Sequence, residues 1–216
     1  MCDSADDGEP SGSGPFLAVD QFKRNVNMKH GIVFAALLLS STLGWRAADA
    51  HTIVVEKDVA PGSQLITLRI SHGCSGAATT ALSVKIPAGV TQVTPAYVPG
   101  WAVAVKERKL DPPIKGWDGA MLSETVDEVT WTGGPIPDHL FADFKLKVEF
   151  PNDSGKTFYF KTIQKCGSTE MRWIETPKQG EKDFDFSDPT NPVAKYKTPS
   201  PFIRVIELPA LGTTRR

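Results

Sequence analysis

The chain has 216 residues, with 24 basic and 25 acidic side chains, 40% hydrophobic residues and 23% charged residues. This balance gives no reason to expect a nucleic-acid-binding protein, the apolar content argues against wholesale disorder, and the length suits a globular fold with a substantial core. Three cysteines are too few for a disulfide-rich scaffold or a cluster of zinc sites.

The segment from Met28 to Ala50 has the three-part layout of a secretory signal peptide. A basic start is followed by an apolar run over Ile32–Leu39 and by small residues that end in Ala-Asp-Ala. The apolar run is shorter than the ~20 residues that span a bilayer. We therefore predict a signal peptide over residues 28–50, cleavage between Ala50 and His51, and a periplasmic or secreted protein.

Residues 1–27 differ from the signal peptide in charge. They contain five acidic side chains, whereas export requires a positively charged start. We interpret this stretch as a disordered extension of the gene model, with Met28 as the true start. No second apolar run follows the cleavage site, so we expect no membrane anchor in the mature chain.

Cleavage changes the charge and the cysteine count. Residues 51–216 hold 20 basic and 19 acidic side chains, and the cysteines that remain are Cys74 and Cys166. An even pair of cysteines in an exported protein indicates a disulfide, and two free buried thiols are the alternative.

Residues 51–175 contain many short runs of β-forming residues separated by Gly, Pro and Asn turn signals. Several runs alternate between apolar and charged residues, as in Phe144–Phe150, which is typical of strands with one buried face. This spacing predicts an all-β fold, an antiparallel sandwich or barrel. The predicted strands are Thr52–Glu56, Leu65–Ile70, Ala81–Ile86, Val90–Thr94, Trp101–Lys106, Thr125–Trp131, Phe141–Phe150, Thr157–Ile163 and Glu170–Ile174.

The strand pattern stops near residue 176. Residues 176–216 are charged and punctuated by proline, which predicts an irregular polar tail without a domain of its own. The tail contains one strand-like run, Phe202–Leu208, that can dock on the sheet.

His51 is the residue whose chemistry changes most on cleavage. As the first residue it offers its α-amine and its ring Nδ1 to one metal ion in a chelate ring. The α-amine has a reference pKa of about 7.7–8.0, so a metal displaces its proton near neutral pH. Two nitrogen donors in this arrangement suit Cu(II). The alternative is a histidine left at the terminus by chance.

Further ligands must come from distant positions. The other histidines of the mature chain are His72 and His139, each in a predicted turn or loop, and Asp138 and Asp143 offer carboxylates near strand starts. No hydrolase, P-loop, HExxH, CxxC or EF-hand motif is present, so no catalytic residue is assigned.

The ordered motifs of residues 51–175 resemble those of the YcnI-like copper-binding family of exported domains. The resemblance rests on Ala50-His51-Thr52, the Ala60-Pro61-Gly62 turn, Ser71-His72-Gly73-Cys74, Pro99-Gly100-Trp101, Trp131-Thr132-Gly133-Gly134, Phe141-Ala142-Asp143-Phe144, Gln164-Lys165-Cys166 and Arg172-Trp173.

The resemblance implies an antiparallel β-sandwich, cupredoxin-like or immunoglobulin-like, that binds one Cu(II) ion. The implied ligand set is His51 through its amine and Nδ1, the carboxylate of Asp143, and the ring of Trp173 close to the metal. The family pattern has Glu where this chain has Asp143, which is one methylene shorter, and Asp138 is the alternative carboxylate. The family is associated with copper homeostasis in the cell envelope, beside other copper-handling proteins.

We therefore expect a copper chaperone or buffer that performs no catalysis. One alternative is a copper oxidoreductase that uses His72 or His139 as a second imidazole ligand. The other is a metal-free sandwich used in adhesion or assembly.

Overall fold

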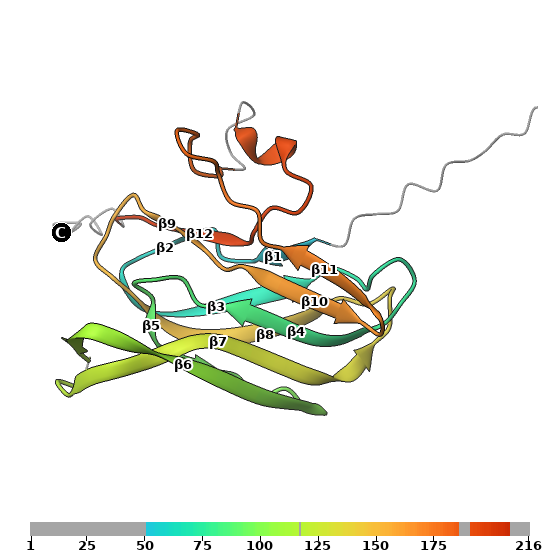
Figure 1. Cartoon of the computed structure of the whole chain (residues 1–216), viewed down its shortest axis with the longest axis horizontal. Helices are drawn as coiled ribbons and strands as arrows, with labels where there is room; N and C mark the ends of the chain where they lie inside the picture. The colour runs from blue at the N-terminus through green and yellow to red at the C-terminus, as the bar shows by residue number, and fades with distance from the viewer. Residues whose placement is uncertain (1–50, 117, 186–190, 208–216) are drawn as a thin grey trace, which may run out of the picture. The chain divides into compact units, whose positions relative to one another are not determined.

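The computed structural model describes residues 51–116, 118–185 and 191–207 (Figure 1). The predicted signal peptide, the extension before it and the end of the predicted tail lie outside these residues. In the described part of the chain, no helix is long and apolar enough to cross a membrane.

Two antiparallel sheets carry most of the strands. The first has the order β1-β3-β8-β5 and the second the order β11-β10-β4-β7-β6. The first sheet consists of β1 (Thr52–Val54), β3 (Gly62–Ile70), β8 (Ala142–Phe150) and β5 (Thr91–Pro95). The second consists of β11 (Thr169–Trp173), β10 (Thr162–Cys166), β4 (Thr79–Lys85), β7 (Met121–Ile136) and β6 (Trp101–Lys115).

A third, smaller sheet has the order β2-β12-β9. It consists of β2 (Asp58–Val59), β12 (Phe202–Val205) and β9 (Thr157–Tyr159). Strand β12 pairs antiparallel with β9 and parallel with β2. It lies within the strand-like run predicted in the tail.

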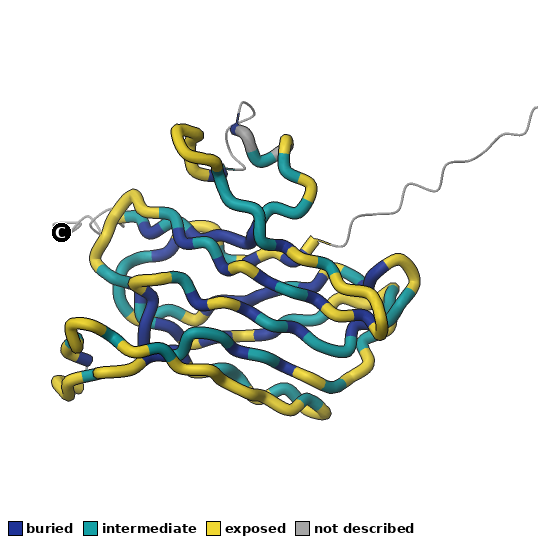
Figure 2. The backbone as a smooth tube through the Cα atoms, viewed as in Figure 1, coloured by how far each residue is buried: buried dark blue, intermediate teal, exposed yellow. Residues whose placement is uncertain are grey.

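The core lies between the two larger sheets. Along β8, Phe144, Leu146 and Val148 are buried, whereas the lysines between them are exposed. The rings of Trp131 on β7 and Trp101 on β6 lie 5.3 and 5.1 Å from the ring of Phe144, centroid to centroid. These contacts join the sheets face to face, and Figure 2 shows the buried stretches along both. The all-β sandwich prediction is confirmed.

Three predicted strands differ most from the structure. Strands β6 and β7 extend well past the predicted ends and form a long hairpin, with a break in register between Lys109 and Ile114. The predicted strand Thr157–Ile163 is two strands in different sheets, β9 and β10. The chain leaves β9 at Phe160, whose N–H donates to the carbonyl of Pro201, 2.7 Å away.

Residues 176–185 and 191–198 form an excursion between β11 and β12 (Figure 1). Its two stems are joined where they leave the sandwich, because the N–H of Ser200 donates to the carbonyl of Glu175 at 2.7 Å. The excursion contains one turn of 3₁₀ helix, Pro192–Lys195. It has an aromatic centre, since Phe184 is buried and contacts the rings of Tyr159 and Tyr196.

Candidate functional site

His51 and Trp173 lie together, although 122 positions separate them in the sequence. Their ring centroids are 5.1 Å apart, and the ring planes are tilted by 31°. His51 directly precedes β1, the edge strand of one sheet, and Trp173 ends β11, the edge strand of the other. The residue predicted to become the N-terminus therefore lies where the edges of the two sheets meet.

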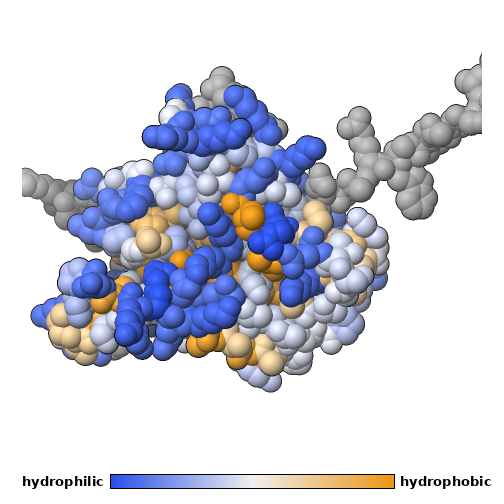
Figure 3. All heavy atoms as spheres, in the orientation of Figure 1, coloured by the Kyte–Doolittle hydropathy of each residue, from blue (hydrophilic) through white to orange (hydrophobic). Residues whose placement is uncertain are grey.

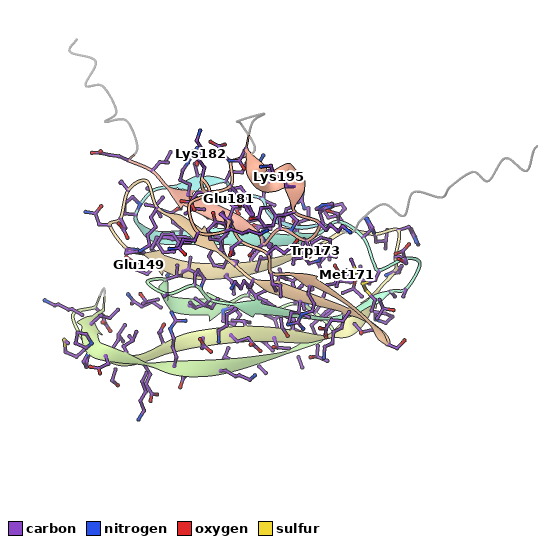
Figure 4. All side chains as sticks on the ribbon, turned by 45° about the horizontal axis from the view of Figure 1, so that its top comes forward. Glu149, Met171, Trp173, Glu181, Lys182 and Lys195 are labelled. Carbon is purple, nitrogen blue, oxygen red and sulfur yellow. A yellow bond between two sulfur atoms is a disulfide. The ribbon has the colours of Figure 1, made fainter. Side chains whose placement is uncertain are left out.

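Trp173 faces the interior, and its side chain is 0% exposed. Figure 4 shows it on β11, next to Met171. The indole Nε1 is buried without a hydrogen-bond partner among the described residues, as are Thr52 Oγ1 and Gln164 Oε1. Buried polar atoms are normally paired, so these three are unusual. The indole gives the His51 ring a rigid, water-excluding surface to lie against.

Ser71 holds the backbone of His51. Its hydroxyl donates to the carbonyl oxygen of His51 at 2.9 Å. Thr52 pairs with Ile70 in the β1–β3 ladder, so His51 and Ser71 occupy the next position of the same register. Ser71 was not assigned a role from the sequence. Its position directly after β3 is the sequence feature that could have suggested a contact with His51.

Asp143 lies on β8 and forms an ion pair with Arg69 of β3. The Nε and Nη2 atoms of Arg69 donate to the two carboxylate oxygens at 2.7 and 2.8 Å. This hydrogen-bonded pair lowers the pKa of Asp143 below its usual value.

The sheet order separates Asp143 from His51. Ile53, Arg69 and Asp143 share one register line across β1, β3 and β8, so Asp143 is two strands away from β1, about 10 Å. The structure thus brings His51 and Trp173 together and places Asp143 beside Arg69. As a copper ligand, Asp143 stays a prediction.

Asp138, the alternative carboxylate, packs against a different segment. Its carbonyl accepts from the N–H of Gly73 at 3.0 Å, and its Oδ1 is buried without a partner among the described residues. A Cβ placed on Gly73 would come within 2.8 Å of that Oδ1 and 2.1 Å of the Ala77 carbonyl. Gly73 is therefore required for this close packing.

The other two histidines have different surroundings. His72 Nδ1 lies 2.9 Å from the carbonyl oxygen of Gly73, and the carbonyl of His72 accepts from Gln164 Nε2 at 2.9 Å. His139 is exposed in the loop before β8. Within the described ranges, no three His, Cys, Asp or Glu side chains form a group that could hold a metal.

Cys74 and Cys166 form a disulfide with an S–S distance of 2.07 Å and a Cα–Cα distance of 5.8 Å, as predicted. It ties the loop between β3 and β4 to the end of β10. Both cysteines are buried, and Gln164 Nε2 also donates to Thr79 Oγ1 at 2.8 Å. The loop that follows Ser71 is therefore fixed to the second sheet by covalent and polar contacts.

Residues 51–196 match the protein-family model described as "Domain of unknown function (DUF1775)". The chain belongs to the DUF1775 family. The match confirms the YcnI-like resemblance and covers the two strands that position His51 and Trp173. No curated protein matches the chain.

A solved structure gives the same architecture for the DUF1775 chain. The chain is similar to an uncharacterized protein from Nocardia farcinica whose crystal structure reveals an immunoglobulin-like fold. The two are 22% identical with a TM-score of 0.52, over 73% of this chain and 99% of the other. This likeness shows the fold alone.

Proposed function

We propose that this DUF1775 protein is exported, binds Cu(II) through His51 after cleavage at Ala50, and acts in envelope copper homeostasis as a chaperone or buffer. The observation that carries the proposal is the contact between the His51 ring and the buried ring of Trp173. A terminus without a function does not need a fixed orientation. A metal-binding terminus does, and packing against the indole fixes the orientation of the imidazole ring.

Two donors come from one residue. Once Ala50 is removed, the α-amine and Nδ1 of His51 can close a chelate ring on Cu(II), which prefers nitrogen donors. Both donors must be deprotonated, so binding releases protons and strengthens as the pH rises toward neutral. Ser71 restrains the backbone of the same residue, which reduces the freedom lost when the ring closes.

The surroundings of His51 fit a bound ion. A cavity of about 270 Å³ opens beside it, and its lining includes the apolar residues Ile53, Pro199 and Phe202 together with the cation Lys57. Apolar walls exclude water and so strengthen the interaction between an ion and its donors. A carboxylate third ligand from Asp143 would have to leave Arg69 and also cross the distance of two strands, about 10 Å.

A site with one imidazole favours holding copper over redox turnover. His72 is engaged with the loop before β4, and the partner of its Nδ1 is the Gly73 carbonyl. A chaperone or buffer fits this donor set better than an oxygen-activating enzyme with two imidazole ligands.

Copper titration followed by electron paramagnetic resonance tests the proposal on the purified secreted protein. N-terminal sequencing comes first, and we expect His51 as the first residue. Wild-type protein should bind one Cu(II) with hyperfine coupling to a single imidazole. The variant His51→Ala should lose this signal, whereas His139→Ala, the matched exposed histidine, should keep it.

Adding four residues, Gly-Ser-Gly-Ser, before His51 supplies a second control, because a single added residue would leave the amine, an amide nitrogen and the imidazole able to chelate Cu(II) together. The ring stays in place, but the α-amine moves away, so affinity should fall as in His51→Ala. Unchanged affinity in this variant would overturn the chelate, and coupling to two imidazoles would support an oxidoreductase instead.

A further inference from the structure

A second cavity, of about 680 Å³, lies between the sandwich and the first half of the excursion. We call it the basic cleft and define it by Lys85, Arg108, Phe158, Lys161, Pro177 and Lys178, all in its lining. None of these residues lines the cavity beside His51. Its size falls in the range of small-molecule sites, about 300–1,000 Å³.

Positive charge predominates in the basic cleft. Its lining contains the five basic residues Lys85, Arg108, Lys156, Lys161 and Lys178, and the three acidic residues Asp127, Glu181 and Asp183. The formal charge of the lining is therefore +2. Figure 3 shows the hydrophilic side chains gathered on the face between the excursion and the β6–β7 hairpin.

Two of the three carboxylates are directed to tyrosines rather than to the cations. The hydroxyl of Tyr159 donates to Asp183 at 2.7 Å, and the hydroxyl of Tyr196 donates to Glu181. Figure 4 labels Glu181 on the excursion. These contacts hold the excursion against the sandwich.

The third carboxylate, Asp127, serves two cations at once. It forms ion pairs with both Lys85 and Arg108. Arg108 also donates to the carbonyls of Ile86 and Pro87 at 2.8 and 3.2 Å, so it braces the loop after β4.

Lys161 and Lys178 are the cations left over. Lys156 pairs with Asp153 at 2.7 Å. Neither Lys161 nor Lys178 has a carboxylate within ion-pair distance in the described part of the chain, and Lys178 is attracted at longer range by Glu175 and Glu181. Lys161 also lies opposite Lys85, because the N–H of Lys85 donates to the carbonyl of Lys161 at 2.9 Å in continuation of the β4–β10 ladder. Like charges directly opposite each other destabilise an antiparallel pair. Asp127 offsets the charge of Lys85, and a bound anion would offset that of Lys161.

The floor of the basic cleft is apolar and aromatic. Phe158 is buried, and the Nζ of Lys156 lies 5.2 Å from its ring centroid. Pro87 and Pro177 also line the cleft. An apolar floor below a cationic rim is suited to a ligand with an apolar body and a charged head.

We propose that the basic cleft binds a small organic anion that carries two negative charges, a phosphate monoester or a dicarboxylate, on an apolar body. Lys161 and Lys178 contact the charged head, and Phe158 and Pro177 contact the body. This site is independent of copper.

Calorimetric titration of the secreted protein with three small aromatic probes tests the site. Phenyl phosphate and phthalate carry two negative charges near pH 7.5, and benzyl alcohol is the neutral control. We expect both anions to bind and the alcohol not to bind. The anion that binds more tightly identifies the head group as phosphate or dicarboxylate.

Charge-reversal variants locate the binding. The double variant Lys161→Glu/Lys178→Glu should weaken anion binding by about tenfold or more, since each reversal replaces an attraction with a repulsion. The control Lys109→Glu/Lys165→Glu makes the same change in net charge at exposed lysines outside the cleft, and it should weaken binding less than about threefold.

Equal losses in the two double variants would mean that only net charge matters and would overturn the site. So would the absence of binding by both anions, or equal binding of benzyl alcohol. The copper affinity of Lys161→Glu/Lys178→Glu should match wild type. The anion-binding proposal and the copper-binding proposal are therefore tested independently of each other.

Discussion

Removing the disulfide should cost a large part of the stability of the fold. Cys74 and Cys166 are 92 positions apart, so the bridge closes a long loop of the unfolded chain. The chain-entropy model gives about 4.5 kcal/mol for a loop of this length at 25 °C. For a domain of roughly this size each kcal/mol shifts Tm by about 2–4 °C, so Cys74→Ala/Cys166→Ala should lower Tm by about 10–18 °C.

Thermal unfolding followed by circular dichroism measures the shift. Wild-type protein treated with a strong reductant serves as the control, because it loses the same bridge without losing the side chains, and its Tm should match that of the double variant. The two single alanine variants should be as unstable as the double one. A fall in Tm under about 4 °C, or two free thiols in the untreated secreted protein by mass, would refute this reasoning.

Three further changes probe the residues around the proposed copper site. Trp173→Phe should abolish most of the quenching of tryptophan fluorescence by Cu(II), because the quenched indole is the one beside the terminal histidine; unchanged quenching contradicts this placement. Ser71→Ala should weaken Cu(II) binding about three- to tenfold through loss of one hydrogen bond, whereas Ser83→Ala, whose hydroxyl bonds to β7, should leave it unchanged. Arg69 lowers the pKa of Asp143, so this carboxylate stabilises the fold fully above about pH 4 and less as the pH falls through the lowered pKa. Urea unfolding between pH 3 and 6 should therefore show a steeper loss of stability in wild type than in Asp143→Asn, and parallel profiles would contradict the coupling.

The strands that local pattern identified best are those with one buried face. Phe144–Phe150 alternates in sequence, and its burial alternates in the structure in the same phase. The predicted strands at β6 and β7 were too short, because Pro112 and Pro113 resemble residues that end a strand. An edge strand tolerates proline, and in β6 both lie where the register with β7 is interrupted, between Lys109 and Ile114.

Other features depend on residues distant in sequence. The chain changes sheet at Phe160 because Pro201 of the C-terminal segment supplies the acceptor for its N–H, and no local pattern carries that information. The same holds for the buried Phe184 in a segment that is mostly charged.

The candidate site was predictable only in part. The chemistry proposed for His51 follows from the predicted cleavage site, whereas its neighbours in the structure follow from sheet order. Trp173 entered through family resemblance, and its contact with His51 joins the edges of two sheets, which residue spacing cannot foretell. Ser71 was missed because a hydroxyl in a turn has many ordinary roles.

The two stems of the excursion are hydrogen-bonded to each other at its base, so the excursion is structurally separable from the sandwich. Besides the bond from Ser200, the N–H of Glu175 donates to the carbonyl of Thr198 at 3.1 Å, so the stems meet before the excursion begins. A short turn spliced in place of residues 176–197 would keep both bonds and preserve the junction of β11 and β12. Such an excision would delete one wall of the basic cleft and spare the His51 terminus. The proposed basic cleft can therefore be changed by mutation without changing the proposed copper site at His51.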